Sequence, residues 1–189
     1  MLDAILFIAF WNCTLFGLES VIVLPGLPFA FAIFGCMYFL NAFPEKTYLH
    51  DQPLLLEIIA LTILVDFIQF NLHLLEHKLH FKSHSIHHRK TTPSCCDAFH
   101  TGIFDAALQL VLPIYIAICV VDPNKTSLIT FGCFYAYWLQ WIHSNSPYAL
   151  SIKSSFFVTP SYHRIHHQQP TKNLSHVFIL WDQLLRLVV

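Results

Sequence analysis

The chain contains long apolar segments, and these restrict its fold more than any other feature. In the hydrocarbon core of a bilayer every backbone polar group must be satisfied internally, so about twenty consecutive apolar residues predict a membrane-spanning helix. Because 56% of the 189 residues are hydrophobic and only 11% are charged, the chain is too apolar for an ordinary soluble domain. We therefore predict an all-α integral membrane protein with four or five transmembrane helices. The segments are residues 4–24, 27–43, 53–72, 103–121 and 126–143.

The N-terminal apolar segment is expected to remain in the mature protein. No positively charged region precedes it, as a cleaved secretory signal would require. The turn signal PGL at residues 25–27 joins it to the next segment, which predicts a helical hairpin. Since no repeat or long linker marks a boundary, we predict a single membrane domain over residues 1–189.

Basic residues are distributed unequally between the two faces of this domain. If all five segments span, residues 72–101 and 144–189 emerge on one face, together with every histidine except His50. That face carries eight Lys and Arg residues, whereas the other carries two, Lys46 and Lys125. Because Lys and Arg accumulate on the cytoplasmic side of membrane proteins, we predict that the histidine-rich face is cytoplasmic.

Histidines follow the third apolar segment at spacings that suit metal binding. Residues 71–90 read NLHLLEHKLHFKSHSIHHRK, with one HxxxH and one HxxHH pattern, and a second HxxHH occurs later as HRIHH. Positions three and four apart share a helix face, and imidazoles packed there without a metal would leave buried polar nitrogens or repelling cations. The spacing therefore predicts metal binding by eight histidines. They are His73, His77, His84, His87, His88, His163, His166 and His167.

The number of imidazoles indicates how many metal ions are bound. A structural zinc site normally has four protein ligands, and a catalytic one has three plus water. Eight histidines exceed what one ion takes, and His143, at the end of the fifth segment in WIHSN, is predicted as a ninth ligand. We therefore predict a dinuclear site. Imidazole binds iron, copper, zinc and nickel, so the spacing leaves the element open.

Other polar residues on this face are candidates for supporting roles. Asp66 continues the face of His73 and His77 back into the apolar segment, where a carboxylate needs a partner. We expect it to accept a hydrogen bond from the second ring N–H of a ligating histidine. Pairing with a basic side chain near the interface is the alternative. Supporting, substrate-channel and surface roles all stay open for His80, His100 and His176.

Charge and cysteine content exclude other classes. With a formal net charge of −1 and no run of Lys or Arg, the chain has no basic surface for nucleic acid. Four of the six cysteines lie in apolar segments, and Cys95 and Cys96 are neighbours without a CxxC spacing. A disulfide framework is therefore not expected.

Taken together, the motifs resemble the fatty acid hydroxylase / sterol desaturase superfamily of membrane-bound, histidine-rich di-iron oxygenases. The resemblance extends from Asp66 to Asp182, and its motifs occur in the family's order. They are DFIQFNLHLLEH, HFKSHSIHH, DAFHTGIFD, WIHSN, TPSYHRIHH and the closing ILWD. On this basis residues 66–189 form the hydroxylase-like region, and residues 1–65 form the N-terminal membrane hairpin and the start of the third helix.

The resemblance implies a helical membrane core with a cytoplasmic, histidine-rich helical cap that holds two iron ions, with zinc as a substitute metal. Such enzymes use O2 and two electrons from a cytochrome b5-like or ferredoxin-type donor. The implied reaction is hydroxylation or desaturation of a fatty acyl or sterol-like lipid, in a bacterial inner membrane or the endoplasmic reticulum. Carried over by position, the nine histidines are the metal ligands, and Asp66, Asn145 and Asp182 match supporting positions.

Departures from the family pattern keep two alternatives open. Leu74 stands where the family often has arginine, NLS replaces NYG at residues 173–175, and LLRLVV follows the terminal WD in place of FGT. One alternative is a family member that keeps the fold without turnover. The other is a zinc peptidase, because HLLEH also fits HxxEH, with His73 and His77 as ligands and Glu76 as general base.

Overall fold

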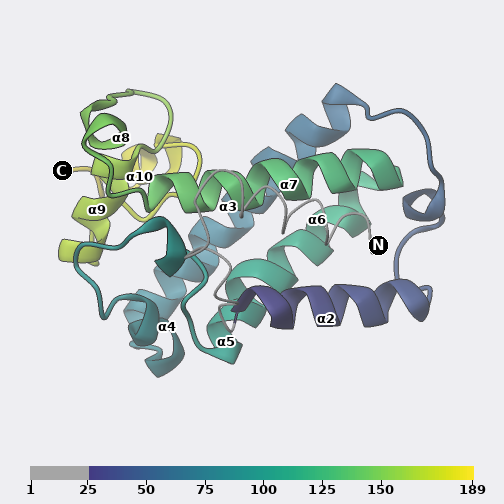
Figure 1. Ribbon diagram of the computed structural model, residues 1–189, viewed down its shortest axis with the longest axis horizontal. Coiled ribbons are helices and arrows are strands. Elements are labelled where there is room, and N and C mark those ends of the chain that lie inside the picture. The colour runs from purple at the N-terminus through teal and green to yellow at the C-terminus, as the bar shows by residue number, and fades with distance from the viewer. Residues whose placement is uncertain (1–25) are drawn as a thin grey trace.

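The computed structural model describes residues 26–189, and the regular structure in this range is helical (Figure 1). In chain order the helices are α2 (Gly26–Phe39), η2 (Glu45–Tyr48), α3 (Leu55–Leu79), α4 (Lys82–His87), η3 (Cys95–Asp97), α5 (Ile103–Ala106), the π-helical turn η4 (Ala107–Val111), α6 (Leu112–Val121), α7 (Lys125–Ile142), α8 (Pro147–Ser151), α9 (Pro160–Gln168) and α10 (Leu180–Leu184). Phe157 and Phe178 form an isolated β-bridge. The all-α prediction is confirmed for residues 26–189, whereas the predicted span at residues 4–24 lies outside the described residues.

Two helical stretches are long and apolar enough to cross a membrane, α3 and the run α5–η4–α6 (Ile103–Val121). α3 has 25 residues, which at 1.5 Å per residue gives a length of roughly 37 Å, more than the ~30 Å hydrocarbon core of a bilayer. The other two predicted spans in the described range form α2, with 14 residues, and α7, with 18. The count of four or five transmembrane helices therefore stays a prediction.

The π-helical turn η4 has a local cause in the sequence. Pro113 has no backbone N–H, so the carbonyl of Gln109, four residues earlier, cannot receive its usual helical hydrogen bond. The helix widens into a π turn before this proline. The Gln109 carbonyl instead accepts a hydrogen bond of 2.9 Å from the side chain of Gln69 in α3. A proline in one long helix thereby creates a contact with the other, one turn before His73.

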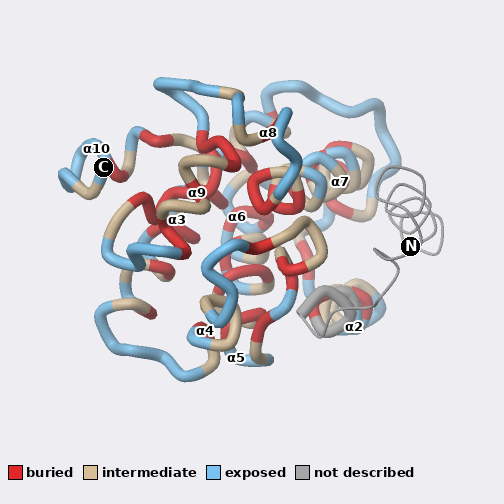
Figure 2. The backbone as a smooth tube through the Cα atoms, turned by 60° about the vertical axis from the view of Figure 1, so that its left-hand side comes forward, coloured by how far each residue is buried: buried red, intermediate tan, exposed pale blue. Residues whose placement is uncertain are grey.

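The core lies between α3, α6 and α7. Leu61 and Val65 of α3, Ile118 of α6 and Phe131 of α7 are completely or almost completely buried. Figure 2 shows that buried segments gather near the centre of the molecule, whereas many of the connecting loops are exposed. Leu56, on the outer surface of α3, is 80% exposed, which fits a helix that faces lipid.

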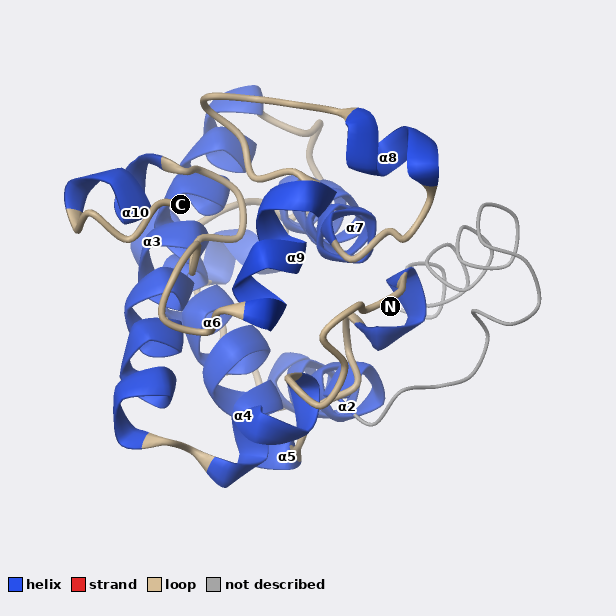
Figure 3. Ribbon diagram, turned by 90° about the vertical axis from the view of Figure 1, so that its left-hand side faces the viewer, coloured by secondary structure: helices blue, strands red, loops and turns tan. Residues whose placement is uncertain are grey.

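The two ends of the helical body differ in composition. At one end the Lys125 N–H donates to the Leu49 carbonyl at 3.0 Å, so the loops before α3 and before α7 meet, and His50 lies in the first of these loops. At the other end, the last turns of α3 and α7 lie close to α4 and α9 (Figure 3). This second end holds the predicted metal ligands.

Candidate metal centre

Four segments bring the predicted ligands together. His73 and His77 lie in the last turns of α3, and its C-cap residue His80 has a left-handed φ of 53° that turns the chain toward α4. α4 and its C-cap carry three more predicted ligands, and His143 is the C-cap of α7. α9 carries the remaining three, and it begins at the N-cap residue Thr159, whose side chain accepts a backbone N–H of the first turn.

The nine predicted ligands form two groups of side chains. Within each group the candidate ligand atoms all lie within 4.8 Å of one another. The first group is His73, His77, His84, His88 and His166, and the second is His87, His143, His163 and His167. Both HxxHH motifs are divided between the groups, so α4 and α9 contribute to each. The geometry offers two places for a metal ion, and the role of these residues as ligands stays a prediction.

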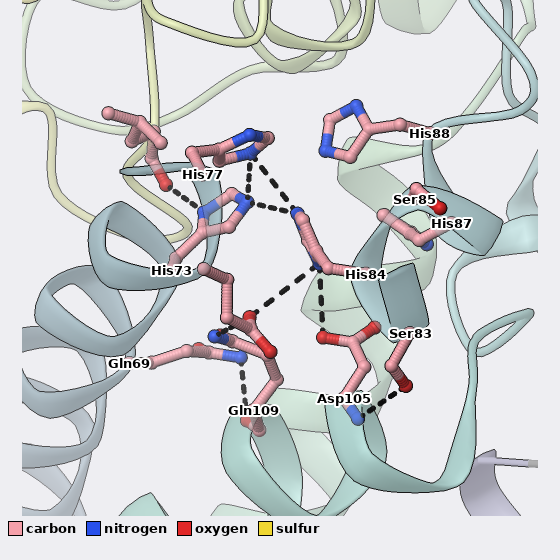
Figure 4. Close-up of polar contacts among 12 residues, drawn as sticks. Gln69, His73, His77, Ser83, His84, Ser85, His87, His88, Asp105 and Gln109 are labelled. Carbon is pink, nitrogen blue, oxygen red and sulfur yellow. Dashed lines mark hydrogen bonds and ion pairs between the residues drawn. The ribbon is translucent and has the colours of Figure 1, made fainter. Parts of the chain in front are cut away.

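In the first group, ring nitrogens face one another through their lone pairs (Figure 4). His73 Nδ1 donates to the Leu174 carbonyl at 2.8 Å, and His84 Nδ1 donates to the Asp105 carboxylate at 3.0 Å. Because these acceptors fix the proton on Nδ1, both Nε2 atoms carry a lone pair, yet they lie 3.0 Å apart. His166 Nε2 lies 3.1 Å from His73 Nε2. Lone pairs this close repel unless a positively charged ion lies between them.

The second group has this construction at two of its four rings, His143 and His167. His143 Nδ1 donates to the Leu139 carbonyl at 2.6 Å, and its Nε2 lies 3.0 Å from His163 Nε2. His167 Nδ1 donates to the Lys90 carbonyl at 3.0 Å, and its buried Nε2 has no hydrogen-bond partner. A buried ring nitrogen without a partner is costly, and a metal ion is a species that would accept its lone pair.

These separations fit coordination of a metal ion in each group. Two neighbouring ligands that are each about 2.1 Å from a metal, at right angles, lie roughly 3 Å apart. The Nε2 atoms of His73 and His84, and those of His143 and His163, are both 3.0 Å apart. The residues present can therefore hold two metal ions through neutral imidazole nitrogens.

Burial keeps these imidazoles in the neutral form that metal binding requires. Burial lowers the pKa of His87 to about 4, with a smaller contribution from the neighbouring His84. Burial also lowers the pKa of His163 and His167 well below its ordinary value, and the surrounding histidines add to this effect. At neutral pH these three rings are uncharged, and each has a lone pair available to a metal.

Asp66 does not have the role predicted for it. Its buried carboxylate accepts hydrogen bonds from the backbone N–H groups of Val177 and Phe178, at 2.8 and 3.0 Å, and from the Trp181 indole at 2.7 Å. Among the described contacts of its side chain, no histidine ring is a donor. The partners lie more than 110 residues away in sequence, so helix periodicity could not predict them. Asp66 holds the C-terminal segment against α3.

Asp182 supports the site indirectly. Its carboxylate accepts hydrogen bonds from the N–H groups of Leu174 and Ser175, both at 2.8 Å, and from the Tyr162 hydroxyl at 2.9 Å. Leu174 supplies the carbonyl that receives His73 Nδ1–H. Asp182 thus fixes the loop that orients one predicted ligand.

The remaining predicted positions belong to neither group of candidate ligands. Asn145 is exposed and accepts a hydrogen bond from Arg164, so it anchors α9. His176 is buried and belongs to neither group, although its ring centroid is 4.7 Å from that of His73. The exposed histidines on this side of the chain are His80 and His100.

A buried polar cluster behind the first group was not identified from the sequence (Figure 4). It includes Asp105, which accepts from His84, and Glu76, whose carboxylate is 3.6 Å from the same ring nitrogen. The Gln109 amide donates to Glu76, and the Gln109 carbonyl accepts from Gln69. The sequence does contain a signal for this cluster, because Asp105 lies in an apolar segment, where a carboxylate requires a partner.

Comparisons with known proteins agree with this geometry. The family model for fatty acid hydroxylases matches residues 58–186. Over 178 residues the chain is 29% identical to a protein of Phaeodactylum tricornutum named "Alternative squalene epoxidase", an alignment that covers 88% of this chain and 51% of the relative. The chain therefore spans about half the length of that relative. No solved structure matches this chain. Because the family model covers more than half of the chain and includes all the histidine motifs, the chain belongs to the fatty acid hydroxylase family, within the sterol desaturase / fatty acid hydroxylase superfamily.

Proposed function

We propose that the protein is an O2-dependent di-iron oxygenase that attacks a C–H bond of a membrane lipid, fatty acyl or sterol-like, by hydroxylation or desaturation. One observation carries the proposal. Nine histidines form two groups, and within each group ring nitrogens face one another at separations that suit metal ligands. Membership of the fatty acid hydroxylase family supports an oxidoreductase that acts on lipid.

The protein's part in this chemistry is to hold the imidazoles in one tautomer. The carbonyls of Leu174, Lys172, Leu139 and Lys90, and the carboxylate of Asp105, each accept an Nδ1–H and thereby direct an Nε2 atom inward. When bound, two iron ions supply the O2 and one-electron chemistry that amino-acid side chains lack. Burial of the ligands excludes bulk water from this centre.

Electrons would come from a cytochrome b5-like or ferredoxin-type donor that docks on the histidine-rich face. Eight of the ten Lys and Arg residues belong to the segments predicted on that face, so a donor with an acidic surface would be guided to it. We propose that this face is cytoplasmic, in a bacterial inner membrane or the endoplasmic reticulum. The lipid would reach the site from the bilayer, without crossing water.

Epoxidation of a carbon–carbon double bond is a second candidate reaction. The relative from Phaeodactylum tricornutum is named as a squalene epoxidase, and the alignment covers most of this chain. Both candidate reactions need O2, electrons and an apolar substrate at the same centre. The chemical identity of the product separates them.

The zinc peptidase hypothesis fits the geometry less well. It requires Glu76 as a free general base, but this carboxylate is buried and accepts a hydrogen bond from Gln109. It also uses only His73 and His77, and leaves the other seven histidines of the two groups without a role. A family member without turnover has the same metal site as an active one, so only product formation distinguishes the two.

Metal content per chain tests the proposal. Protein purified anaerobically from iron-supplemented cells is expected to contain about two irons per chain, because each group offers enough ligands for one ion. The double variant His87→Ala/His166→Ala removes a ligand from each group and should lose most of the iron. His50→Ala, at the opposite end of the molecule, is the matched control.

Other metal contents would support other functions. One zinc per chain would favour the peptidase, and folded protein that takes up no metal would overturn the oxygenase. Two irons without any O2-dependent lipid product, in the presence of a reductant, would identify a family member without turnover.

A further inference from the structure

An apolar cavity of about 230 Å³ lies between α2, α6 and α7. Phe34 of α2, Ile114 of α6 and Leu128 of α7 are among the residues that line it. In Figure 1, α2 and α6 lie away from α8, α9 and α10, whereas α7 extends from beside these helices to the other end of the molecule. The cavity takes no part in the metal centre described above.

The cavity follows α7 toward the metal centre. Its lining on this helix runs from Lys125 to Leu139, a distance of about 21 Å at 1.5 Å per residue. The Leu139 carbonyl accepts the Nδ1–H of His143 at 2.6 Å, so one end of the cavity lies within a helical turn of the second histidine group. The cavity is therefore an elongated slot along α7, a shape that suits a single extended hydrocarbon chain better than a compact fused ring system.

The charge of the residues that line the cavity indicates which kind of ligand the cavity would bind. Among the described residues that line the cavity, only Lys125 is charged, at the end far from the histidines. Its ammonium donates to the Tyr38 hydroxyl at 3.1 Å and lies 5.1 Å from the centroid of the Tyr38 ring. A carboxylate or phosphate removed from water needs several hydrogen-bond donors, which the remaining, mostly apolar lining does not supply. The cavity therefore suits an uncharged chain.

A glycine in the middle of α7 keeps part of this space open. Gly132 lines the cavity, and a Cβ atom built on it would meet no atom of the described residues within 4 Å. Glycine is disfavoured inside a helix, and close packing against a neighbour is the usual reason for it. Packing within residues 26–189 does not explain Gly132, because no side chain of these residues approaches it. An occupant that needs the space would explain it.

We propose that this cavity binds the uncharged, acyclic hydrocarbon chain of the substrate, and that Gly132 sets the width of the slot. The inference rests on the proposed lipid oxygenase function and narrows its substrate class. An isoprenoid or alkyl chain in the slot would have one end near the second histidine group and the other near Lys125. A fused-ring sterol or a free fatty acid would fit the slot and its charge less well.

Binding of labelled squalene to the full chain in lipid nanodiscs tests this inference. Gly132→Trp fills the space, and it is expected to weaken squalene binding by about tenfold or more, since the chain loses its contacts with the wall. Gly132→Ala should have a smaller effect. Thr130→Trp adds the same side chain at an exposed position of α7 outside the lining, and it should bind squalene as the parent does. Equal binding by Gly132→Trp and the parent would overturn the proposal.

Two further probes test the class of ligand. Labelled palmitic acid tests whether the ligand is uncharged. If it binds the parent more tightly than squalene does, and does not bind Lys125→Met, the inference of an uncharged ligand is wrong. Cholesterol tests whether the ligand is acyclic. If it displaces squalene from the parent but does not bind Gly132→Trp, the inference of an acyclic ligand is wrong. Unfolding temperature and iron content are measured on every variant, and unchanged values show that Gly132→Trp is folded. Iron content reports on the proposed oxygenase and squalene binding on the cavity, so each can fail separately.

Discussion

Replacement of Asp66 by asparagine should destabilise the protein strongly, although it changes only one oxygen atom to an NH2 group. One carboxylate oxygen accepts from the Val177 N–H, and the other accepts from the Phe178 N–H and the Trp181 indole. An asparagine can keep only one acceptor oxygen. In its better orientation the oxygen keeps the two bonds to Phe178 and Trp181, and its NH2 group faces the Val177 N–H.

The cost follows from this geometry. Loss of a hydrogen bond to a charged group costs about 1.5–3 kcal/mol, and a buried N–H left without an acceptor adds about 1–3 kcal/mol. The side chain is fully buried, so water cannot replace the lost acceptor. We expect a total of roughly 3–5 kcal/mol, which for a chain of this size lowers the unfolding temperature by about 10 °C.

Thermal unfolding of the full chain in nanodiscs, followed by tryptophan fluorescence, measures this effect. Asp51→Asn, at an exposed position, is the matched control and should change the stability by less than about 0.5 kcal/mol. Trp181→Phe should be somewhat less damaging in the Asp66→Asn background than in the parent, because the Trp181 indole then donates to a neutral amide oxygen and no longer to a charged carboxylate. The reasoning would be refuted if Asp66→Asn and Asp51→Asn unfolded at the same temperature.

Three further predictions concern the metal centre and pH. Asp105→Ala removes the acceptor of the His84 Nδ1–H and should weaken iron binding by about 10- to 100-fold in a competition with a chelator; unchanged affinity would show that Asp105 does not orient this ligand. Removal of iron by chelation should lower the unfolding temperature, and added ferrous iron should restore it, because an ion at 100 times its Kd stabilises by about 2.7 kcal/mol; a metal-independent temperature would contradict the lone-pair argument. Burial by itself raises the pKa of Asp97, but hydrogen bonds from Lys90 and Ser94 lower it below its ordinary value. Its stabilisation is therefore complete above the unfolded pKa of about 3.9 and is lost as pH falls through the lowered folded pKa, so the stability difference between the parent and Asp97→Asn should shrink below about pH 4 and not above it.

Much of the metal centre followed from local sequence. HxxxH and HxxHH place imidazoles on one face of a helix by the geometry of a single turn, which needs no knowledge of distant contacts. The structure brings together the eight histidines selected in this way and His143, which was predicted from its place at the end of the fifth apolar segment. The all-helical character also followed, because apolar segments of this length favour helices in a bilayer.

The arrangement of these histidines depends on tertiary contacts. Whether a ring joins the group of five or the group of four depends on how α4 and α9 dock beside the ends of α3 and α7, and both HxxHH motifs are divided by this docking. Four of the five Nδ1 acceptors are backbone carbonyls, and two of these belong to distant loops: Leu174 for His73, 101 residues away, and Lys90 for His167, 77 residues away. A carbonyl carries no side-chain signature, so no motif could reveal it.

Acidic and amide residues show the same division between local and distant causes. The sequence determined by itself that Asp66 must have a partner, because an isolated carboxylate is costly in an apolar helix, but only the fold decided that the partner is the C-terminal segment. Pro113 determined a local break in helical hydrogen bonding, and only the packing of two long helices directed the freed Gln109 carbonyl to Gln69. Periodicity and backbone chemistry act over a few residues and can be read along the chain, whereas hydrogen-bond partners more than one hundred residues apart are set by how the helices pack.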